Sequence, residues 1–518
     1  MPPETALKAK PWTLALASIA IFMLMLDVTV VNVALPDLRT SLGADFSDLQ
    51  WVIDSYTLTL AAFLLTGGSL ADRLGRKRVF TLGLVLFVLS SLAAGLAQDV
   101  LTLNLARGVQ GAGAAVLFSV GPALIGHEFR GADRGKAFGV FGGVAGLALA
   151  VGPLVGGFLT DALSWRWIFL VNVPIGALAL VAGLLFLRES REPAAHGIDW
   201  AGMVTFGAGL ALIVLGFLRG EAAGWTSAPI AAAFAGGAGL IVVFVWVEKR
   251  LGDRAMFDLS LLRIPTFTGV CLATFLSNAT SLAAVFLQIS YVQNVLGYSP
   301  WDTGLRFMPM MLTLFVVAAL TGGLLASVPP GLLIGSSIGL IGLGMGLIVL
   351  VEPGSSWTAM LPSMIVTGIG MGLFNPPRAA VTIGVVRPEK AGMASGMGET
   401  FQQVGVAVGI AGFGALFHHK VVSAFVASDA GTALGGHADA VAQTVASGGT
   451  SKLAETVPAD SLGEATTAAR QAFVDALCDV MVFCALVAAV GAAIAFLSIR
   501  TGDLHESAQS EPEVPAAL

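Results

Sequence analysis

The stretch Gly67-Gly-Ser-Leu-Ala-Asp-Arg-Leu-Gly-Arg-Lys-Arg78 lies between two long apolar runs, residues 51–66 and 79–97. A loop this short and this basic between two membrane-length segments predicts a tight hairpin on the cytoplasmic side of a membrane. Its glycines allow two helices to approach closely and to turn sharply. Asp72 lies among several cations, so part of the charge can be paired within the loop: Arg73, Arg76, Lys77 and Arg78.

The composition of the whole chain also indicates a membrane protein. Of its 518 residues, 56% are hydrophobic and only 12% are charged, whereas charged residues make up about 25% of soluble domains. The 64 glycines suit helices that pack closely in a bilayer. Its three cysteines, Cys271, Cys478 and Cys484, all fall in apolar runs, so we expect neither a disulfide nor a metal site.

The apolar runs predict an all-α integral membrane protein with fourteen spans, because a membrane-crossing helix needs about 20 apolar residues. The runs are residues 13–35, 51–71, 79–98, 101–123, 137–159, 166–187, 201–218, 229–247, 266–290, 303–326, 331–350, 357–383, 394–418 and 478–499. The first run is too long for a cleaved signal peptide and is expected to remain as a helix.

The basic residues predict the orientation. With the N-terminus inside, 18 of the 27 Lys and Arg residues fall in cytoplasmic segments, 7 fall outside and 2 lie within spans. This asymmetry predicts that both termini lie in the cytoplasm. We expect the protein to span the cell (inner) membrane. Residues 419–477 then form a long polar loop outside the cell, with a short amphipathic helix expected near 463–475. Residues 501–518 are acidic and poor in large apolar residues, which predicts a disordered cytoplasmic tail.

Several motifs resemble the major facilitator superfamily, in particular its fourteen-helix drug:proton antiporter branch. The hairpin at 67–78 resembles the signature loop between helices 2 and 3. Leu26–Pro36 is similar to the first-helix signature, and Leu103–Ala115 to the fourth-helix motif. Gly152-Pro-Leu-Val-Gly-Gly157 resembles the core of the antiporter motif of helix 5, although Ala148 stands where a further glycine is usual.

The resemblance implies the major facilitator fold: two six-helix bundles plus two inserted helices. Residues 1–190 would form the N-terminal bundle, 198–248 the inserted helices, and 262–500 the C-terminal bundle with the loop 419–477. Substrate would bind between the bundles and be exposed to each side in turn as they rock. The resemblance also implies a conformational switch, formed by Gly67, Asp72, Arg73, Gly75, Arg76, Gly152, Pro153, Gly156 and Gly157.

Asp27 and Arg107 are the first candidates for proton coupling. Asp27 lies about fifteen residues into the first span, roughly 22 Å from its inner end. A carboxylate at this depth is costly unless it is protonated, paired or in contact with water. Arg107 lies at a comparable depth in helix 4, and it can hold Asp27 ionised until a proton or a cationic drug arrives. The alternatives are a purely structural ion pair or, for Asp27, hydrogen bonds to Asn32 or Thr29.

Other polar residues in the spans are candidates for substrate contact. Gln110 shares a helix face with Arg107 and can contact substrate or satisfy the arginine. Glu399 and Arg378 lie at similar depths in adjacent helices, as a structural ion pair or as a second proton or cation site. Gln402 and Gln403 follow one turn after Glu399, and Asn32 lies in the first span. Asp54, at the outer start of helix 2, is expected to be a cap or rim residue.

The leading functional hypothesis is a proton-coupled antiporter that exports amphipathic, cationic or antibiotic-like drugs, without a cofactor and as a monomer. Alternatives are a dedicated exporter of one endogenous natural product and an uptake symporter. The sequence contains no nucleotide-binding motif, no clustered catalytic residues and no basic pattern for nucleic acid, so we expect a transporter that is not an enzyme. The counterpart of the basic hairpin in the second half, Gly322–Gly331, lacks charge, which predicts that gating depends mainly on the N-terminal bundle.

Overall fold

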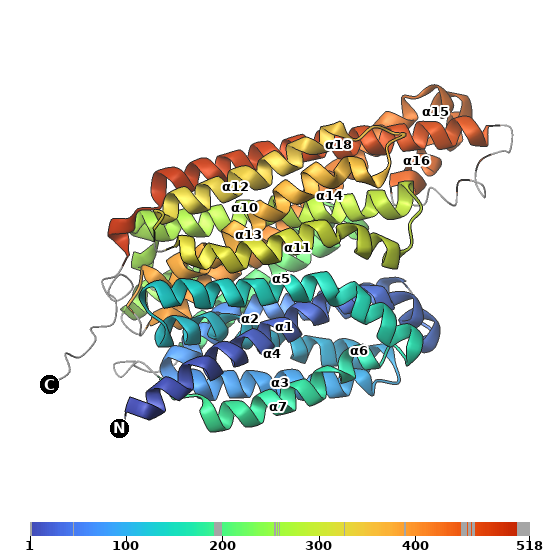
Figure 1. Cartoon of the computed structure of the whole chain (residues 1–518). Helices are drawn as coiled ribbons and strands as arrows, with labels where there is room; N and C mark the ends of the chain where they lie inside the picture. The colour runs from blue at the N-terminus through green and yellow to red at the C-terminus, as the bar shows by residue number, and fades with distance from the viewer. Residues whose placement is uncertain are drawn as a thin grey trace.

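The computed structural model describes residues 3–504 apart from 45, 191–198, 253–254, 256, 258, 326, 388–389, 447–452, 454–456 and 458–460. The described residues form helices and contain no β-strand. Thirteen of the helices are long and apolar enough to cross a membrane. The predicted span 137–159 corresponds to a further helix of 32 residues, α5 (Gly131–Ala162), which lies alongside them (Figure 1). The predicted all-α membrane architecture is therefore confirmed.

The N-terminal half of the chain forms one bundle, shown in blue and cyan in Figure 1. Its helices are α1 (Pro3–Leu42), α2 (Phe46–Leu74), α3 (Arg76–Gly95), α4 (Val100–Glu128), α5, and the pair α6 (Trp167–Leu170) and α7 (Asn172–Phe186). Large apolar side chains on the outer faces are exposed, such as Leu178 at 73% and Leu185 at 69%. In a bilayer these side chains face lipid, which is as apolar as they are.

The C-terminal half forms a second bundle above the first in Figure 1. Its helices are α10 (Pro265–Ser290), α11 (Pro300–Leu324), α12 (Pro330–Gly346), α13 (Leu361–Gly384), α14 (Ala391–Val426) and α18 (Leu462–Ser498). The first turn of α1 and the C-terminal end of α18 lie at the same end of the molecule (Figure 1). We call this the terminal end and the opposite one the far end.

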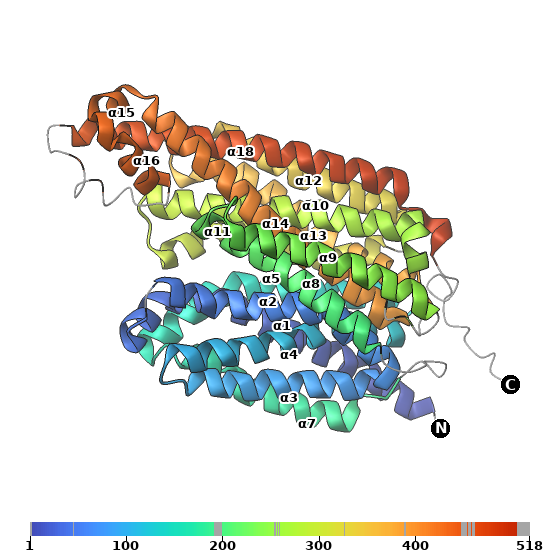
Figure 2. The same cartoon turned by 180° about the vertical axis from the view of Figure 1, so that it is seen from behind.

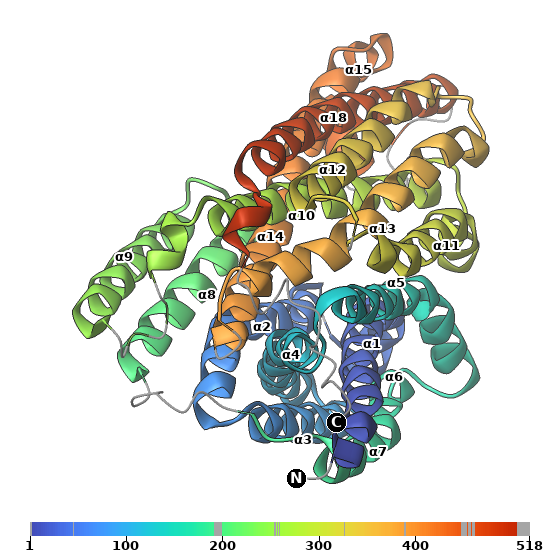
Figure 3. The same cartoon turned by 60° about the vertical axis from the view of Figure 1, so that its left-hand side comes forward.

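The inserted helices α8 (Trp200–Ala223) and α9 (Ala228–Leu251) pack against each other beside the two bundles (Figures 2 and 3). The inner helix of this pair, α8, packs on α2 and also touches α14. Near the far end Arg219 of α8 forms an ion pair with Asp54 of α2, with Nε and Oδ2 3.1 Å apart. Asp54 is buried in the third turn of α2, so the expectation that it caps the helix or lies on its rim was wrong.

The loop predicted at 419–477 is largely helical where the structure describes it. Helix α14 continues to Val426, α18 begins at Leu462, and α15 (Asp429–Leu434) and α16 (Ala438–Ala446) lie between them at the far end. The amphipathic helix expected near 463–475 is not separate, because it runs without a break into the last span. Helix α18 has 37 residues and is therefore about 55 Å long, well beyond the roughly 30 Å hydrocarbon core.

The two bundles meet most tightly in their terminal halves. Helix α2 approaches α14 so closely that a Cβ on Gly68 would collide with the carbonyl oxygen of Gly392. We call this contact of α2 with α14, and that of α5 with α11, the two seams between the bundles. At the second seam, a Cβ on Gly322 of α11 would lie 2.6 Å from the carbonyl oxygen of Gly135 of α5. Small residues permit this backbone-to-backbone packing. The structure is thus closed at its terminal end.

Candidate functional site

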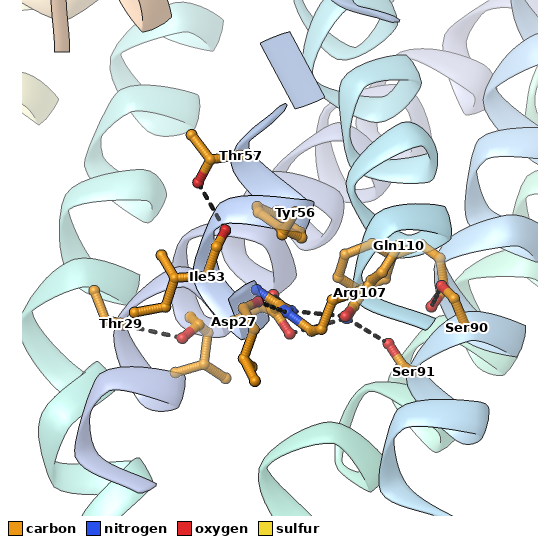
Figure 4. Close-up of polar contacts among 12 residues, drawn as sticks. Asp27, Thr29, Ile53, Tyr56, Thr57, Ser90, Ser91, Arg107 and Gln110 are labelled. Carbon is orange, nitrogen blue, oxygen red and sulfur yellow. Dashed lines mark hydrogen bonds and ion pairs between the residues drawn. The ribbon is translucent and has the colours of Figure 1, made fainter. Parts of the chain in front are cut away.

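Asp27 and Arg107 form an ion pair inside the N-terminal bundle (Figure 4). Nη1 of Arg107 on α4 donates to Oδ2 of Asp27 on α1 across 2.6 Å. Both residues are almost fully buried, at 2% and 1% exposure. The predicted match in depth is therefore confirmed, and the pair lies where neither charge has access to bulk solvent in this conformation.

Gln110 completes the network from the next turn of α4. Its side-chain oxygen accepts a hydrogen bond from Arg107 Nη1 at 2.7 Å. Its Nε2 donates to Asp27 Oδ1 at 2.9 Å and to Ser91 Oγ of α3 at 2.8 Å. Gln110 has no exposed surface, so in this conformation it satisfies the ion pair and does not face a ligand.

Arg107 has further contacts that the sequence did not reveal. Its Nε donates to the carbonyl oxygen of Val52 at 3.1 Å. Its guanidinium lies 4.2 Å from the ring centroid of Tyr56, a position in which the ring face attracts the cation (Figure 4). Tyr56 could have been identified as a candidate from the sequence, because it is one of only three tyrosines in the chain and lies in an apolar span.

The neighbouring contact of α1 with α5 involves the glycines of the predicted helix-5 motif. A Cβ on Gly152 would collide with the hydroxyl of Thr29, and one on Gly156 would lie 3.2 Å from the Cα atom of Val30. Gly157 is half-buried. These glycines therefore hold α5 against the turn of α1 that follows Asp27. The side chains of Pro153 and Asn32, both predicted site residues, lie outside the described part of the structure.

Arg378 of α13 and Glu399 of α14 form the corresponding pair in the C-terminal bundle. Arg378 Nη2 donates to Glu399 Oε1 at 3.0 Å, and both residues are buried. The pairing expected from their matched depths is thus present. Three buried polar atoms beside this bond have no hydrogen-bond partner among the described residues: Glu399 Oε2, Arg378 Nε and Gln402 Oε1. Gln403 is half-buried one residue further along.

The basic hairpin joins the two bundles at the terminal end. Asp72 accepts two hydrogen bonds from Arg76, and it also accepts the backbone N–H groups of Gly392 at 3.0 Å and Met393 at 2.8 Å. These N–H groups belong to the first turn of α14, where the helix dipole favours a negative charge. Asp72 therefore ties α2 to α14 across the seam.

The rest of the hairpin supports this bond. Gly75 has a φ of +110°, which favours glycine, and a Cβ there would collide with the carboxylate of Glu189. A Cβ on Gly67 would lie 3.0 Å from the Cα atom of Val116, so this glycine lets α2 pack on α4. Arg73 Nη2 donates to the carbonyl oxygen of Ala255 at 2.6 Å, beyond the end of the inserted helices.

Comparisons with known proteins agree with this architecture. The family model described as the Major Facilitator Superfamily matches residues 17–201 and 199–410. The chain is 34% identical over 409 residues to the multidrug resistance protein Stp of Mycobacterium tuberculosis (strain CDC 1551 / Oshkosh), covering 78% of this chain and 75% of the relative. It is 37% identical over 406 residues to the puromycin resistance protein pur8 of Streptomyces alboniger, covering 77% and 80%.

A solved structure shares the fold. The human organic anion transporter MFSD10 aligns with a TM-score of 0.58, at 15% sequence identity, over 94% of this chain and all of that one. At this identity the likeness concerns the fold alone.

Proposed function

Because this chain belongs to the Major Facilitator Superfamily, we propose that it exports amphipathic drugs across the cell membrane in exchange for protons. Drug and antibiotic resistance is the role named for its relatives, and a transporter rather than an enzyme suits a chain built of membrane-spanning helices. The substrates would be amphipathic, cationic or antibiotic-like molecules, handled by a monomer whose terminal end faces the cytoplasm.

The observation that carries the proposal of proton coupling is the composition of the Asp27 network. Arg107 keeps three contacts that do not require a charged Asp27: the Val52 carbonyl, the Gln110 side-chain oxygen and the Tyr56 ring. When Asp27 takes up a proton, the guanidinium therefore remains solvated by protein groups. Protonation then removes one ion pair without leaving Arg107 as an isolated buried charge.

Helix packing connects Asp27 mechanically to the contact between α5 and α11. Thr29 and Val30 follow Asp27 on α1 and press against Gly152 and Gly156 of α5. The terminal half of α5 in turn packs against α11 of the other bundle. A change in the bonding of Asp27 would thereby alter the fit of α5, while Asp72 holds the seam between α2 and α14 closed. Release of both seams would expose the space between the bundles to the cytoplasm.

Transport by the purified protein in lipid vesicles tests the proposal. With an imposed pH gradient, we expect uphill movement of a cationic fluorescent dye against the direction of proton flow, and its loss when a protonophore is added. Dye and protons moving in the same direction would identify a symporter instead. Dye movement that is unaffected by the protonophore would exclude proton coupling.

A narrower exporter is the second candidate, because one relative is named for resistance to puromycin alone. Vesicles that move one antibiotic and none of a panel of structurally unrelated cations would support it. Transport of several unrelated cations would exclude it.

A further inference from the structure

Arg134 differs from the other buried arginines of the described chain. Four are buried: Arg76, Arg107, Arg134 and Arg378. Three of them pair with a carboxylate, namely Asp72, Asp27 and Glu399. Arg134 is only 8% exposed, yet no described carboxylate lies within ion-pair distance of it. Among the described residues its guanidinium makes one long hydrogen bond, from Nη2 to the carbonyl oxygen of Ala380 at 3.3 Å, and its buried Nε has no partner there.

A buried guanidinium without a counter-charge is unfavourable, because burial removes water and no opposite charge replaces it. Arginine cannot relieve this cost by losing its proton. The carbonyl of Ala380, near the end of α13, supplies only a partial negative charge. A bound anion would supply the opposite charge that the guanidinium of Arg134 lacks among the described residues.

Arg134 lines a small pocket at the terminal end of the seam. From the N-terminal bundle the pocket is lined by His127, Arg130 and Arg134, and from the C-terminal bundle by Ile383, Val386 and Ala391. The free space in this pocket is about that of one water molecule. Arg130 and His127 lie at the exposed rim, with His127 Nδ1 4.0 Å from Glu128 Oε1. Helix α5 begins at Gly131, so its positive end also faces this region.

We propose that Arg134, Arg130 and His127 form a binding site for a phosphate-type oxyanion, either free phosphate or the headgroup of an anionic lipid. One oxygen would enter the pocket against Arg134, and the remaining oxygens would meet Arg130 and His127 at the rim. The planar donor fork of arginine matches this geometry. Basic pockets between membrane helices at the headgroup level are suited to anionic lipids.

The site spans both bundles, so occupancy favours the conformation closed at the terminal end. Opening this end separates the N-terminal-bundle cations from the α13 and α14 side of the pocket and exposes Arg134 to water. The bound oxyanion therefore acts as a removable counter-charge for the seam. This regulatory consequence rests on the alternating access proposed above, whereas binding itself does not.

Thermal unfolding of the purified full-length protein in a neutral detergent tests binding without drug or proton gradient. Phosphate is titrated against chloride at constant ionic strength. We expect a saturable rise in melting temperature of about 1–3 °C, because a ligand that binds only the folded state stabilises it. The rise should disappear in Arg134→Gln and shrink in Arg130→Gln, which changes an exposed residue and should not disturb folding.

Arg263→Gln is the matched control, because Arg263 is an exposed arginine at the same end of the chain's fold. It should keep the full phosphate response. Two outcomes would overturn the proposal. One is an equal rise in the wild type and all three variants; the other is no rise in any of them, together with no response to lipid. Arg134 would then serve only to hydrogen-bond α13.

Nanodiscs distinguish the two sources of the anion. In phosphate-free buffer, the protein is compared in phosphatidylcholine alone and in phosphatidylcholine with phosphatidylglycerol. Stabilisation by phosphatidylglycerol that Arg134→Gln and Arg130→Gln both reduce, and Arg263→Gln does not, assigns the site to a lipid headgroup. A response to phosphate but not to phosphatidylglycerol assigns it to the free ion.

Discussion

Each bundle contains a buried arginine–carboxylate pair, but the two pairs are completed differently. In the N-terminal bundle both oxygens of Asp27 accept hydrogen bonds, and Arg107 is also held by Val52, Gln110 and Tyr56. In the C-terminal bundle a single bond joins Arg378 to Glu399, and one atom on each side of it lacks a described partner. A completed network fixes the positions of its charges, whereas an incomplete one retains capacity to bind a further group.

The hairpins at the terminal end repeat this difference. Asp72 crosses the seam to the first turn of α14, while the counterpart hairpin after α11 has no charged residue from Gly322 to Gly331. The seam between α5 and α11 relies instead on close packing of Gly135 with Gly322. The two halves of the molecule therefore differ in how their buried charge pairs are completed and in how they hold the terminal end closed.

Replacing Asp27 should have the largest effect on this comparison. Asp27→Asn removes the only carboxylate of the N-terminal network, and proton-driven dye export should fall roughly 100-fold, the scale expected when a proton-transferring group is lost. Asp37→Asn, which changes an exposed aspartate of the same helix, is the control and should transport normally. Export that persists in Asp27→Asn at the wild-type rate would remove this network from the coupling mechanism.

Asp72→Asn should have the next largest effect, a loss of about tenfold in transport. The substitution leaves the buried Arg76 without its counter-charge and weakens the bond to α14, which together amount to several kcal/mol. Spin labels on the terminal ends of α2 and α14 should report a larger separation than in the wild type. Asp133→Asn removes an exposed pair with Lys136 and should leave the distance unchanged. An unchanged distance in Asp72→Asn would show that Asp72 does not hold α2 against α14.

Glu399→Gln should have a moderate and selective effect. Because Glu399 has an oxygen without a described partner, we expect export of cationic dyes to fall about threefold to tenfold when this carboxylate of a buried charge pair is neutralised. Export of an uncharged amphipathic substrate should change little. Equal losses for charged and uncharged substrates would instead assign the Arg378–Glu399 pair to folding, and a lower melting temperature would accompany them.

Adding the missing charges to the second hairpin should have the smallest effect. In Ser327→Asp/Val328→Arg, the new residues occupy the positions that correspond to Asp72 and Arg73, and transport should change less than about twofold, as for exposed charges in general. The same double substitution in an Asp72→Asn background tests whether the hairpins are interchangeable. Restoration of transport there would contradict the unequal roles of the two halves.

Much of this organisation could be predicted from the sequence, because hydrophobic length and depth along a helix are local quantities. Counting residues from the ends of the spans was sufficient to place Asp27 level with Arg107 and Glu399 level with Arg378. Asp54 was misplaced for a related reason: the apolar run begins at residue 51, whereas the helix begins at Phe46. Apolar length marks the hydrocarbon core and not the end of a helix.

Contacts between distant helices could not be predicted in this way. The pairing of Asp54 with Arg219 depends on how α8 packs against α2, and the ring of Tyr56 meets Arg107 only because of the rotation of α2. The absence of a described counter-charge for Arg134 is visible only after both bundles have been placed. Such features follow from packing, which is decided by the fit of many side chains at once.

The length of α14 and α18 has a mechanical consequence. Both helices continue from the C-terminal bundle to the α15–α16 segment at the far end, and α18 exceeds the hydrocarbon core by about 25 Å. The segment is thus carried on two stiff rods that are anchored in a moving body. A tilt of the C-terminal bundle therefore displaces the α15–α16 segment further than it displaces the bundle itself. A fluorophore on α15 would report this displacement in each transport cycle from outside the bilayer.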